Sequence, residues 1–136
     1  MPADKRLLVV TAAVIERDGQ FLVTRRQAGV HLEGFWEFPG GKCEAGESHE
    51  ACLARELREE LDAAAEIGAL ILSTRHDYED RTVELHFFAC RLLGPARPLL
   101  GQEMRWVDRH ELGRLPFPPA DRELIDRLTQ PGPSPS

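Results

Sequence analysis

The stretch GGKCEAGESHEACLARELREELD, residues 40–62, joins a glycine pair to a polar loop and then to an acidic, helix-forming segment. Ser48 is a favourable N-cap residue, and apolar side chains recur at helical spacing from Ala51 to Leu61. The stretch therefore predicts a loop that runs into a helix, which begins after Ser48 and ends near Leu61.

The acidic residues of this helix fall on one of its faces. Each residue of an α-helix advances by about 100°, so Glu56, Glu59 and Glu60 occupy roughly one third of the circumference, opposite the apolar stripe. Neighbouring carboxylates repel one another, and hard divalent cations such as Mg²⁺ or Mn²⁺ relieve that repulsion. A solvated helix face, laced by ion pairs with Arg55 and Arg58, is the alternative interpretation. The preceding glycine pair favours a metal site, because a backbone without side chains approaches a ligand closely.

The rest of the chain predicts short strands, a hairpin and one further helix. The hairpin turns at Asp18-Gly19, a dipeptide typical of tight turns between strands. Pro39-Gly40-Gly41 ends an aromatic strand and starts a loop. We expect strands over residues 7–15, 21–24, 34–38, 67–73, 82–92 and 104–107, and a helix over residues 119–128. The strands outnumber the helices without strict alternation, which indicates an α/β sandwich with a mixed sheet, in which 67–73 and 82–92 pair antiparallel.

Composition limits the class of protein. The 136 residues fit one domain, which we place at 1–130, followed by a disordered tail at 131–136. No apolar run reaches membrane length and no signal-peptide cleavage pattern follows the first strand, so we expect a cytoplasmic protein without a membrane partner. A formal net charge of −6 disfavours binding to duplex nucleic acid. Cys43, Cys52 and Cys90 are odd in number and lack metal-binding spacing, so we expect reduced thiols.

The loop and helix resemble the Nudix box, whose pattern is Gly-x5-Glu-x7-Arg-Glu-apolar-x-Glu-Glu-x-Gly. The matching residues are Gly41, Glu47, Arg55, Glu56, Leu57, Glu59 and Glu60. Asp62 stands where the pattern has glycine, at a helix end where aspartate also tolerates a left-handed backbone. The likeness extends over nearly the whole chain and is strongest to the MutT branch, including its CTP pyrophosphohydrolase type. It runs through residues 24–26, 36–42, 78–81 and 117–121.

The resemblance implies the Nudix α/β/α sandwich with its loop and helix, and a Mg²⁺-dependent hydrolase for which Mn²⁺ is a substitute. The implied metal ligands, for two or more ions, are Glu56, Glu59, Glu60 and the Gly40 carbonyl. Such ions neutralise a polyphosphate that a net-acidic protein would otherwise repel, and they lower the pKa of the attacking water. The bond that is cut would lie between the α and β phosphorus atoms.

The resemblance also implies a substrate pocket. Arg26 matches a phosphate-contacting arginine, and strand alternation places Arg25 on the opposite face. The other implied substrate-binding residues are His31, Phe38, Tyr78, Asp80, Leu85, Ala120 and Asp121. Four of them have plainer alternatives, which are a solvated loop residue for His31, ordinary core for Phe38 and Leu85, and a helix cap for Asp121.

The catalytic base has no acidic residue in the usual place. Relatives in the MutT branch carry an acid six positions before the tryptophan of the last strand, and Leu100 stands there in this chain. Glu103 is the nearest acid, and it would act as the catalytic base if the loop is shifted by a few residues. Otherwise Glu60 or a metal-bound hydroxide would remove the proton. We expect Arg55 to pair with Glu47 and so to hold the loop against the helix. The alternative role for Glu47 is that of a peripheral metal ligand.

The function favoured by the sequence is a nucleoside triphosphate pyrophosphohydrolase, which releases a nucleoside monophosphate and pyrophosphate. It would clean the nucleotide pool of modified nucleotides such as 8-oxo-dGTP or CTP and dCTP analogues. A dinucleoside polyphosphate or cap hydrolase is the enzyme alternative. A catalytically silent nucleotide-binding module is the alternative from another class, and the three retained glutamates argue against it. We expect a monomer or a homodimer.

Overall fold

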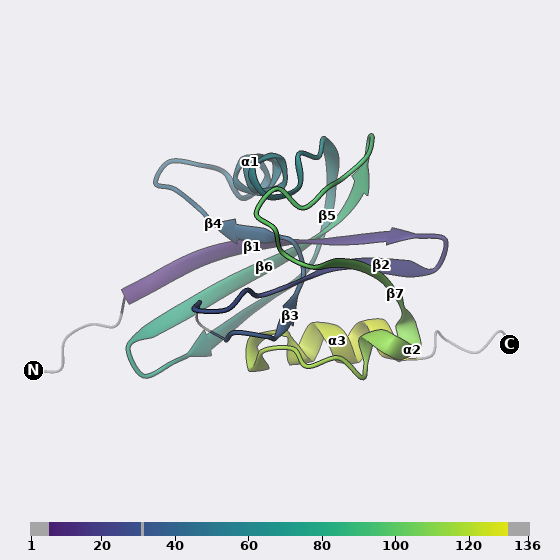
Figure 1. Cartoon of the computed structure of the whole chain (residues 1–136). Coiled ribbons are helices and arrows are strands. Elements are labelled where there is room, and N and C mark those ends of the chain that lie inside the picture. The colour runs from purple at the N-terminus through teal and green to yellow at the C-terminus, as the bar shows by residue number, and fades with distance from the viewer. Residues whose placement is uncertain (1–5, 31, 131–136) are drawn as a thin grey trace, which may run out of the picture.

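Seven strands form a mixed sheet, and helices pack on both of its sides (Figure 1). The computed structural model describes residues 6–30 and 32–130. The strands are β1 Arg6–Arg17, β2 Gln20–Arg25, β3 Trp36–Glu37, β4 Gly40–Lys42, β5 Ala65–Asp77, β6 Arg81–Leu92 and β7 Met104–Asp108. The helices are α1 His49–Leu61, α2 Arg109–Leu112 and α3 Arg122–Thr129, with a 3-10 turn, η1, at Pro119–Asp121.

The sheet is mixed because β1 runs parallel to β6, while the other pairs of strands are antiparallel. The strand order is β3-β2-β1-β6-β5, with β4 also paired to β1 and β7 to β2. The predicted α/β sandwich with a mixed sheet is therefore confirmed. The predicted antiparallel pairing of the two long strands β5 and β6 is confirmed as well.

Side chains that alternate along the central strands enter two separate cores. Ala12 of β1 and Leu85 of β6 pack in the core that contains Leu124 of α3. Ala13 of β1 packs in the other core, which contains Leu57 of α1. Because successive residues of a strand point to opposite faces, one buried strand serves both helical layers. This alternation places Leu85 on the α3 side of the sheet.

The acidic helix α1 begins and ends where the sequence predicts. The hydroxyl oxygen of Ser48 accepts a hydrogen bond from the Ala51 N–H at 3.1 Å. At the other end Asp62 adopts a left-handed backbone with φ of 50°, and its N–H donates to the Arg58 carbonyl. The helix buries Cys52, Leu53, Leu57 and Leu61. Its acidic face therefore stays clear of the core.

Residues 40–42 form a strand instead of the predicted loop. β4 pairs antiparallel with β1, so that Gly40 lies opposite Ala12 and Lys42 opposite Val10. A Cβ atom at Gly40 would collide with the Thr11 carbonyl, so this close pairing requires glycine. The sequence predicted a loop here because a Pro-Gly-Gly run usually interrupts strands. The sequence also does not predict the short helix α2.

Cys43 and Cys52 are joined by a disulfide, so the expectation of reduced thiols is wrong for this pair. Cys43 directly follows β4 and Cys52 lies in the first turn of α1, and their Cα atoms are 5.2 Å apart, within the usual range for a disulfide. The loop between β4 and α1 brings the pair together through tertiary structure. Their spacing along the chain therefore provides no motif. Cys90 lies buried in the core on the α1 side.

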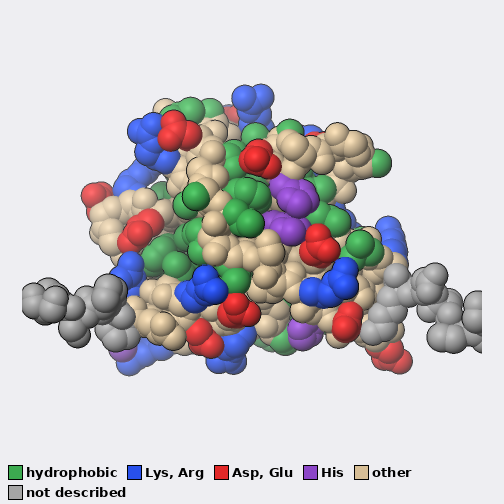
Figure 2. Space-filling view, turned by 180° about the vertical axis from the view of Figure 1, so that it is seen from behind, with side chains coloured by type: hydrophobic (Ala, Val, Ile, Leu, Met, Phe, Trp, Pro, Cys, Tyr) green, Lys and Arg blue, Asp and Glu red, His purple; other side chains and the backbone are tan. Residues whose placement is uncertain are grey.

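The face turned away from the viewer in Figure 1 carries basic and acidic side chains scattered around an apolar area, and not one basic patch (Figure 2). Within residues 6–30 and 32–130, no helix is long and apolar enough to cross a membrane. The single domain over 1–130 stays a prediction, and the tail predicted at 131–136 lies outside the described residues.

Candidate active site

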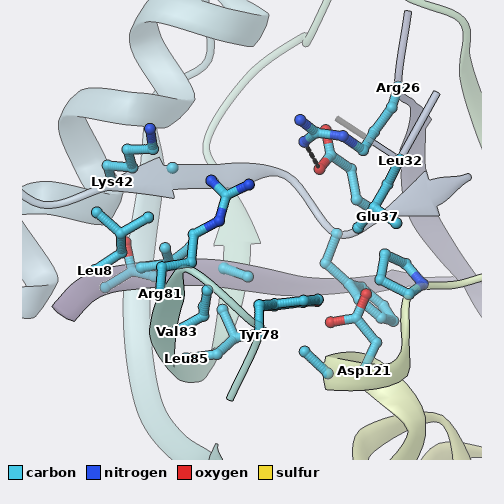
Figure 3. A pocket seen from close by; sticks show the side chains of 18 of the residues that line it. Leu8, Arg26, Leu32, Glu37, Lys42, Tyr78, Arg81, Val83, Leu85 and Asp121 are labelled. Carbon is cyan, nitrogen blue, oxygen red and sulfur yellow. Dashed lines mark hydrogen bonds and ion pairs between the residues drawn. The ribbon is translucent and has the colours of Figure 1, made fainter. Parts of the chain in front are cut away.

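A cavity of about 270 Å³ opens on the α3 side of β1 and β6 (Figure 3). Arg26 and Glu37 lie at one corner of it, and Lys42 and Arg81 lie on the opposite side (Figure 3). Asp121, the last residue of η1, also lines it. The cavity brings together eight residues that the sequence predicts for the site. They are Arg26, Phe38, Gly40, Glu60, Tyr78, Leu85, Ala120 and Asp121.

Four other predicted site residues stand outside the described lining of this cavity. They are Glu56, Glu59, Asp80 and Glu103. Asp80 is exposed in the β5–β6 turn, where its carboxylate lies 3.6 Å from the Arg81 guanidinium. His31 lies outside the described residues, so its predicted contact with phosphate stays a prediction.

Glu60 is the member of the acidic face that reaches the cavity. Burial away from water, together with the negative charges of Glu37 and Glu56, raises the pKa of Glu60 to about 8. The N–H of Gly40 donates a hydrogen bond to this carboxylate, and the positive charge of Arg26 also opposes the shift. A carboxylate placed in this way has a strong electrostatic tendency to take up a proton or a cation.

Arg55 holds the other acidic side chains of the loop and helix. Its guanidinium binds Glu47 through two hydrogen bonds of 2.7 and 2.8 Å, which confirms the predicted brace. The same guanidinium donates to Glu56 at 2.9 Å and to Glu59 at 3.2 Å. The hydrogen bonds from Arg55 and from the Glu44 N–H lower the pKa of Glu47 to about 2. Arg55 therefore binds one carboxylate of the loop and two of α1.

The donor set suits a hard divalent cation. Within the described part of the chain, no three acidic, histidine or cysteine side chains stand close enough to form a metal cage, and Arg55 donates hydrogen bonds to both Glu56 and Glu59. A Cβ atom at Gly41 would collide with the Glu56 carboxylate, so the glycine leaves room for that group beside β4. Burial raises the pKa of Glu56 as it does that of Glu60. All-oxygen ligands with mutually repelling charges fit Mg²⁺ or Mn²⁺.

Glu37 is a further acid of the site that the sequence does not single out. Its carboxylate accepts a hydrogen bond from Arg26 at 2.9 Å, and both side chains line the cavity (Figure 3). Burial raises the pKa of Glu37, and the Arg26 charge partly offsets that effect. Arg25, in contrast, is half exposed and lies 3.5 Å from Glu103. Arg26, and not Arg25, therefore lines this cavity together with Glu60, and its contact with phosphate stays a prediction.

The part of the cavity beside η1 is aromatic and apolar, with one acid. The ring of Phe38 stacks on Phe117 at 5.4 Å and meets Phe87 edge-on at 6.0 Å. Asp121 is only 6% exposed, and burial together with the charge of Glu37 raises its pKa to about 7. Among the described residues, the Asp121 side chain makes no capping hydrogen bond to α3, so the cap alternative finds no support.

Lys42 and Arg81 are two cationic residues of the cavity that the sequence does not single out as site residues. In Figure 3 the Arg81 guanidinium extends along the cavity wall toward the part of β4 that carries Lys42. Within the described residues, the buried Nε atom of Arg81 finds no hydrogen-bond partner. Their only sequence signal is position, since Lys42 follows the glycine pair and Arg81 begins β6 directly after a polar turn.

Glu103 does not share the cavity with Glu60. Its carboxylate accepts a hydrogen bond from Arg105 at 3.0 Å and lies 3.5 Å from Arg25, in a separate hollow. We expect Glu103→Gln to slow catalysis less than Glu60→Gln does, because two arginines hold the Glu103 carboxylate away from the Glu60 side. Steady-state kcat of the two variants is the measurement. A larger loss at Glu103 would identify it as the base.

The metal-free protein is expected to lose stability as the pH rises from about 4.5 to 8. The folded protein raises the pKa of Glu60 from 4.5 to about 8 and that of Asp121 from 3.8 to about 7. The folded state therefore holds protons that the unfolded state has released, and stability present at low pH is lost as these groups ionise. The measurement is Tm in EDTA across this range. Glu60→Gln should flatten the profile, and an equally steep profile in that variant would contradict the assignment.

Comparison with known proteins identifies relatives over most of the chain. The NUDIX domain matches residues 10–127. The chain is 36% identical to a CTP pyrophosphohydrolase of Escherichia coli (strain K12) over 122 residues, which cover 89% of this chain and 90% of that protein. It is 36% identical to an 8-oxo-dGTP diphosphatase of Haemophilus influenzae over 127 residues, covering 92% and 93% of the two chains.

A solved structure supports the same relationship. The solution structure of the E. coli ORF135 protein matches with a TM-score of 0.81 and 34% sequence identity, and the match covers 95% of this chain and 96% of that one. Sequence and backbone therefore agree over nearly the whole length of both proteins.

Proposed function

Because this chain belongs to the Nudix hydrolase family, as a nucleotide pyrophosphohydrolase of the MutT type, we propose a specific reaction for it. The protein cleaves a modified nucleoside triphosphate into the monophosphate and pyrophosphate. The supporting observation is a single cavity that joins Glu60 and Arg26 to an aromatic pocket with Asp121. A nucleoside triphosphate has the matching parts, an anionic polyphosphate and a flat base.

The charged part of the cavity receives the polyphosphate in this proposal. Glu56, Glu59, Glu60 and the Gly40 carbonyl would hold the divalent ions. When bound there, Mg²⁺ would neutralise phosphate charge and lower the pKa of an attacking water. Arg26 contacts phosphate oxygens, and its ion pair with Glu37 fixes the guanidinium at the cavity wall.

In this proposal Glu60 is the general base that removes the proton from the attacking water. The Glu60 carboxylate lines the cavity, whereas Glu103 is bound by arginines in another hollow. A general base must reach the proton that it removes, so position favours Glu60.

The aromatic part of the cavity receives the base. Tyr78 offers an aromatic face on which a base can stack, while Phe38, Leu85 and Ala120 provide apolar walls. Asp121 then reads the polar edge of the base. Because its pKa lies near neutrality, Asp121 accepts a hydrogen bond when ionised and donates one when protonated. This property suits CTP or dCTP analogues and, with the protonated form, 8-oxo-dGTP.

The deciding experiment measures pyrophosphate and nucleoside monophosphate released from a panel of nucleotides with Mg²⁺. The panel contains CTP, dCTP, dGTP, 8-oxo-dGTP and a dinucleoside tetraphosphate. We expect equal amounts of the two products from at least one triphosphate, and a higher kcat/KM for a modified one. Preferential cleavage of the dinucleoside compound, or binding without turnover of any compound, would overturn the proposal. Removal of modified nucleotides from the cytoplasmic pool is the biological role that we propose.

A further inference from the structure

The segment 93–103 between β6 and β7, here called the strap, crosses the C-terminal end of α1. The Arg97 N–H donates to the Leu61 carbonyl at 2.8 Å, and the Leu99 N–H donates to the Glu60 carbonyl at 2.9 Å. The last carbonyls of a helix have no partner within the helix. The strap therefore supplies the partners that fix the final turn of α1, where Glu60 lies.

The side chain of Gln102 connects this strap to the helix from inside. Gln102 is only 8% exposed. Its Nε2 atom donates to the Glu60 carbonyl at 3.2 Å, and its Oε1 atom accepts from the Leu100 N–H at 2.9 Å. Both ends of one buried amide are thus used, one on the helix and one on the strap. Breaking such a buried arrangement leaves polar groups without partners.

The connection continues to the segment that carries Arg26. The Leu100 carbonyl accepts a hydrogen bond from Gln27 at 2.8 Å, and Gln27 directly follows Arg26. The residues linked in this way line a common hollow of about 170 Å³. Its lining includes Arg26, Gln27, Glu37, Glu60, Leu100 and Gln102. Gln102 thereby joins the backbone of Glu60 to the opposite wall of the site.

We propose that Gln102 is a positioning residue that sets the Glu60 carboxylate relative to Arg26 through its two hydrogen bonds. The inference rests on the function proposed for Glu60. The one carboxylate of the strap, Glu103, is bound by Arg25 and Arg105 in a separate hollow, so the contribution of the strap at Glu60 is geometric. Residues that hold a metal ligand or a reacting group in place typically change metal affinity or activity by about 10- to 100-fold when replaced.

The test is Gln102→Met, which keeps the length of the side chain and removes both hydrogen bonds. We expect kcat to fall by about tenfold or more, KM for the nucleotide to change by less than about threefold, and Mn²⁺ affinity, measured by EPR without nucleotide, to weaken by about tenfold. Arg97→Gln is the matched control, because it breaks only the exposed pair of the strap with Asp62 at 2.8 Å. It should keep the wild-type kcat and Mn²⁺ affinity.

A lower Tm with unchanged kcat and Mn²⁺ affinity in Gln102→Met would overturn the inference. If that variant does not fold, Gln102→Asn carries the same test, because it keeps a neutral amide but is too short to reach both Leu100 and Glu60. The Mn²⁺ measurement does not depend on substrate. Failure of the wild-type enzyme to release pyrophosphate would therefore sink the proposed function alone, while the Mn²⁺ affinities would still decide the role of Gln102.

Discussion

Replacing Glu60 with glutamine is expected to lower kcat by orders of magnitude, and Glu59→Gln is expected to have a similar effect. Both carboxylates belong to the acidic face of α1, opposite its buried leucines, and the Glu59 side chain is 59% exposed. The amide keeps the shape of the side chain but loses the negative charge that binds Mg²⁺. Steady-state pyrophosphate release at saturating nucleotide, over a range of Mg²⁺ concentrations, measures the loss.

The same substitution should not destabilise the metal-free protein. The pKa of Glu60 is raised to about 8 by burial and by the charges of Glu37 and Glu56, so ionisation of Glu60 opposes folding at neutral pH. A neutral amide removes that cost, and the Tm of Glu60→Gln in EDTA should equal or exceed that of the wild type. Mg²⁺ should raise the wild-type Tm by mass action, and this rise should shrink in the variant.

Glu50→Gln is the matched control for both variants. Glu50 is exposed in the first turn of the same helix and stands outside the described cavity lining. Its replacement should leave turnover at the wild-type level, with at most a small loss of helix stability. Near-normal turnover in both Glu59→Gln and Glu60→Gln would show that the acidic face is not the metal site.

Features specified by neighbours along the chain were predictable from the sequence. The cap at Ser48 and the left-handed end at Asp62 follow from local backbone preferences, and they fix both ends of α1. The hairpin turn at Asp18-Gly19 follows in the same way, and both residues have positive φ. The acidic face is a consequence of helical spacing. Each of these features requires only residues within a few positions of one another.

The shape of the cavity depends instead on contacts between distant segments. Lys42 enters it because β4 pairs with β1, and Arg81 enters it because β6 pairs with β1 on the α3 side. Glu37 affects the pKa of both Glu60 and Asp121, although the three lie on separate elements. Local patterns carry no information on such pairings. For the same reason the sequence did not predict the disulfide between β4 and α1.

Asp121→Asn is expected to shift the kcat/KM ratio toward 8-oxo-dGTP and away from CTP or dCTP analogues. Asparagine carries both a donor and an acceptor, so it can satisfy the O6 acceptor and the N7 hydrogen of 8-oxoguanine together. An ionised aspartate only accepts, which favours the amino group of cytosine or adenine and opposes O6. The side chain is buried in the cavity wall beside Ala120, so the base meets it without competing bulk water.

The pH dependence of this selectivity separates base recognition from a structural role. Because burial and Glu37 raise the pKa of Asp121 to about 7, the protonated carboxyl, which can donate to O6, becomes the major form below that pH. The wild-type preference for 8-oxo-dGTP over CTP should therefore fall as the pH rises through about 7. In Asp121→Asn the ratio should not change with pH, since the amide does not titrate. Both nucleotides compete in one reaction, which cancels pH effects common to them, and each tenfold change in the ratio corresponds to about 1.4 kcal/mol. A ratio unchanged by the substitution at every pH, with only Tm lowered, would leave Asp121 a structural residue of the η1–α3 segment.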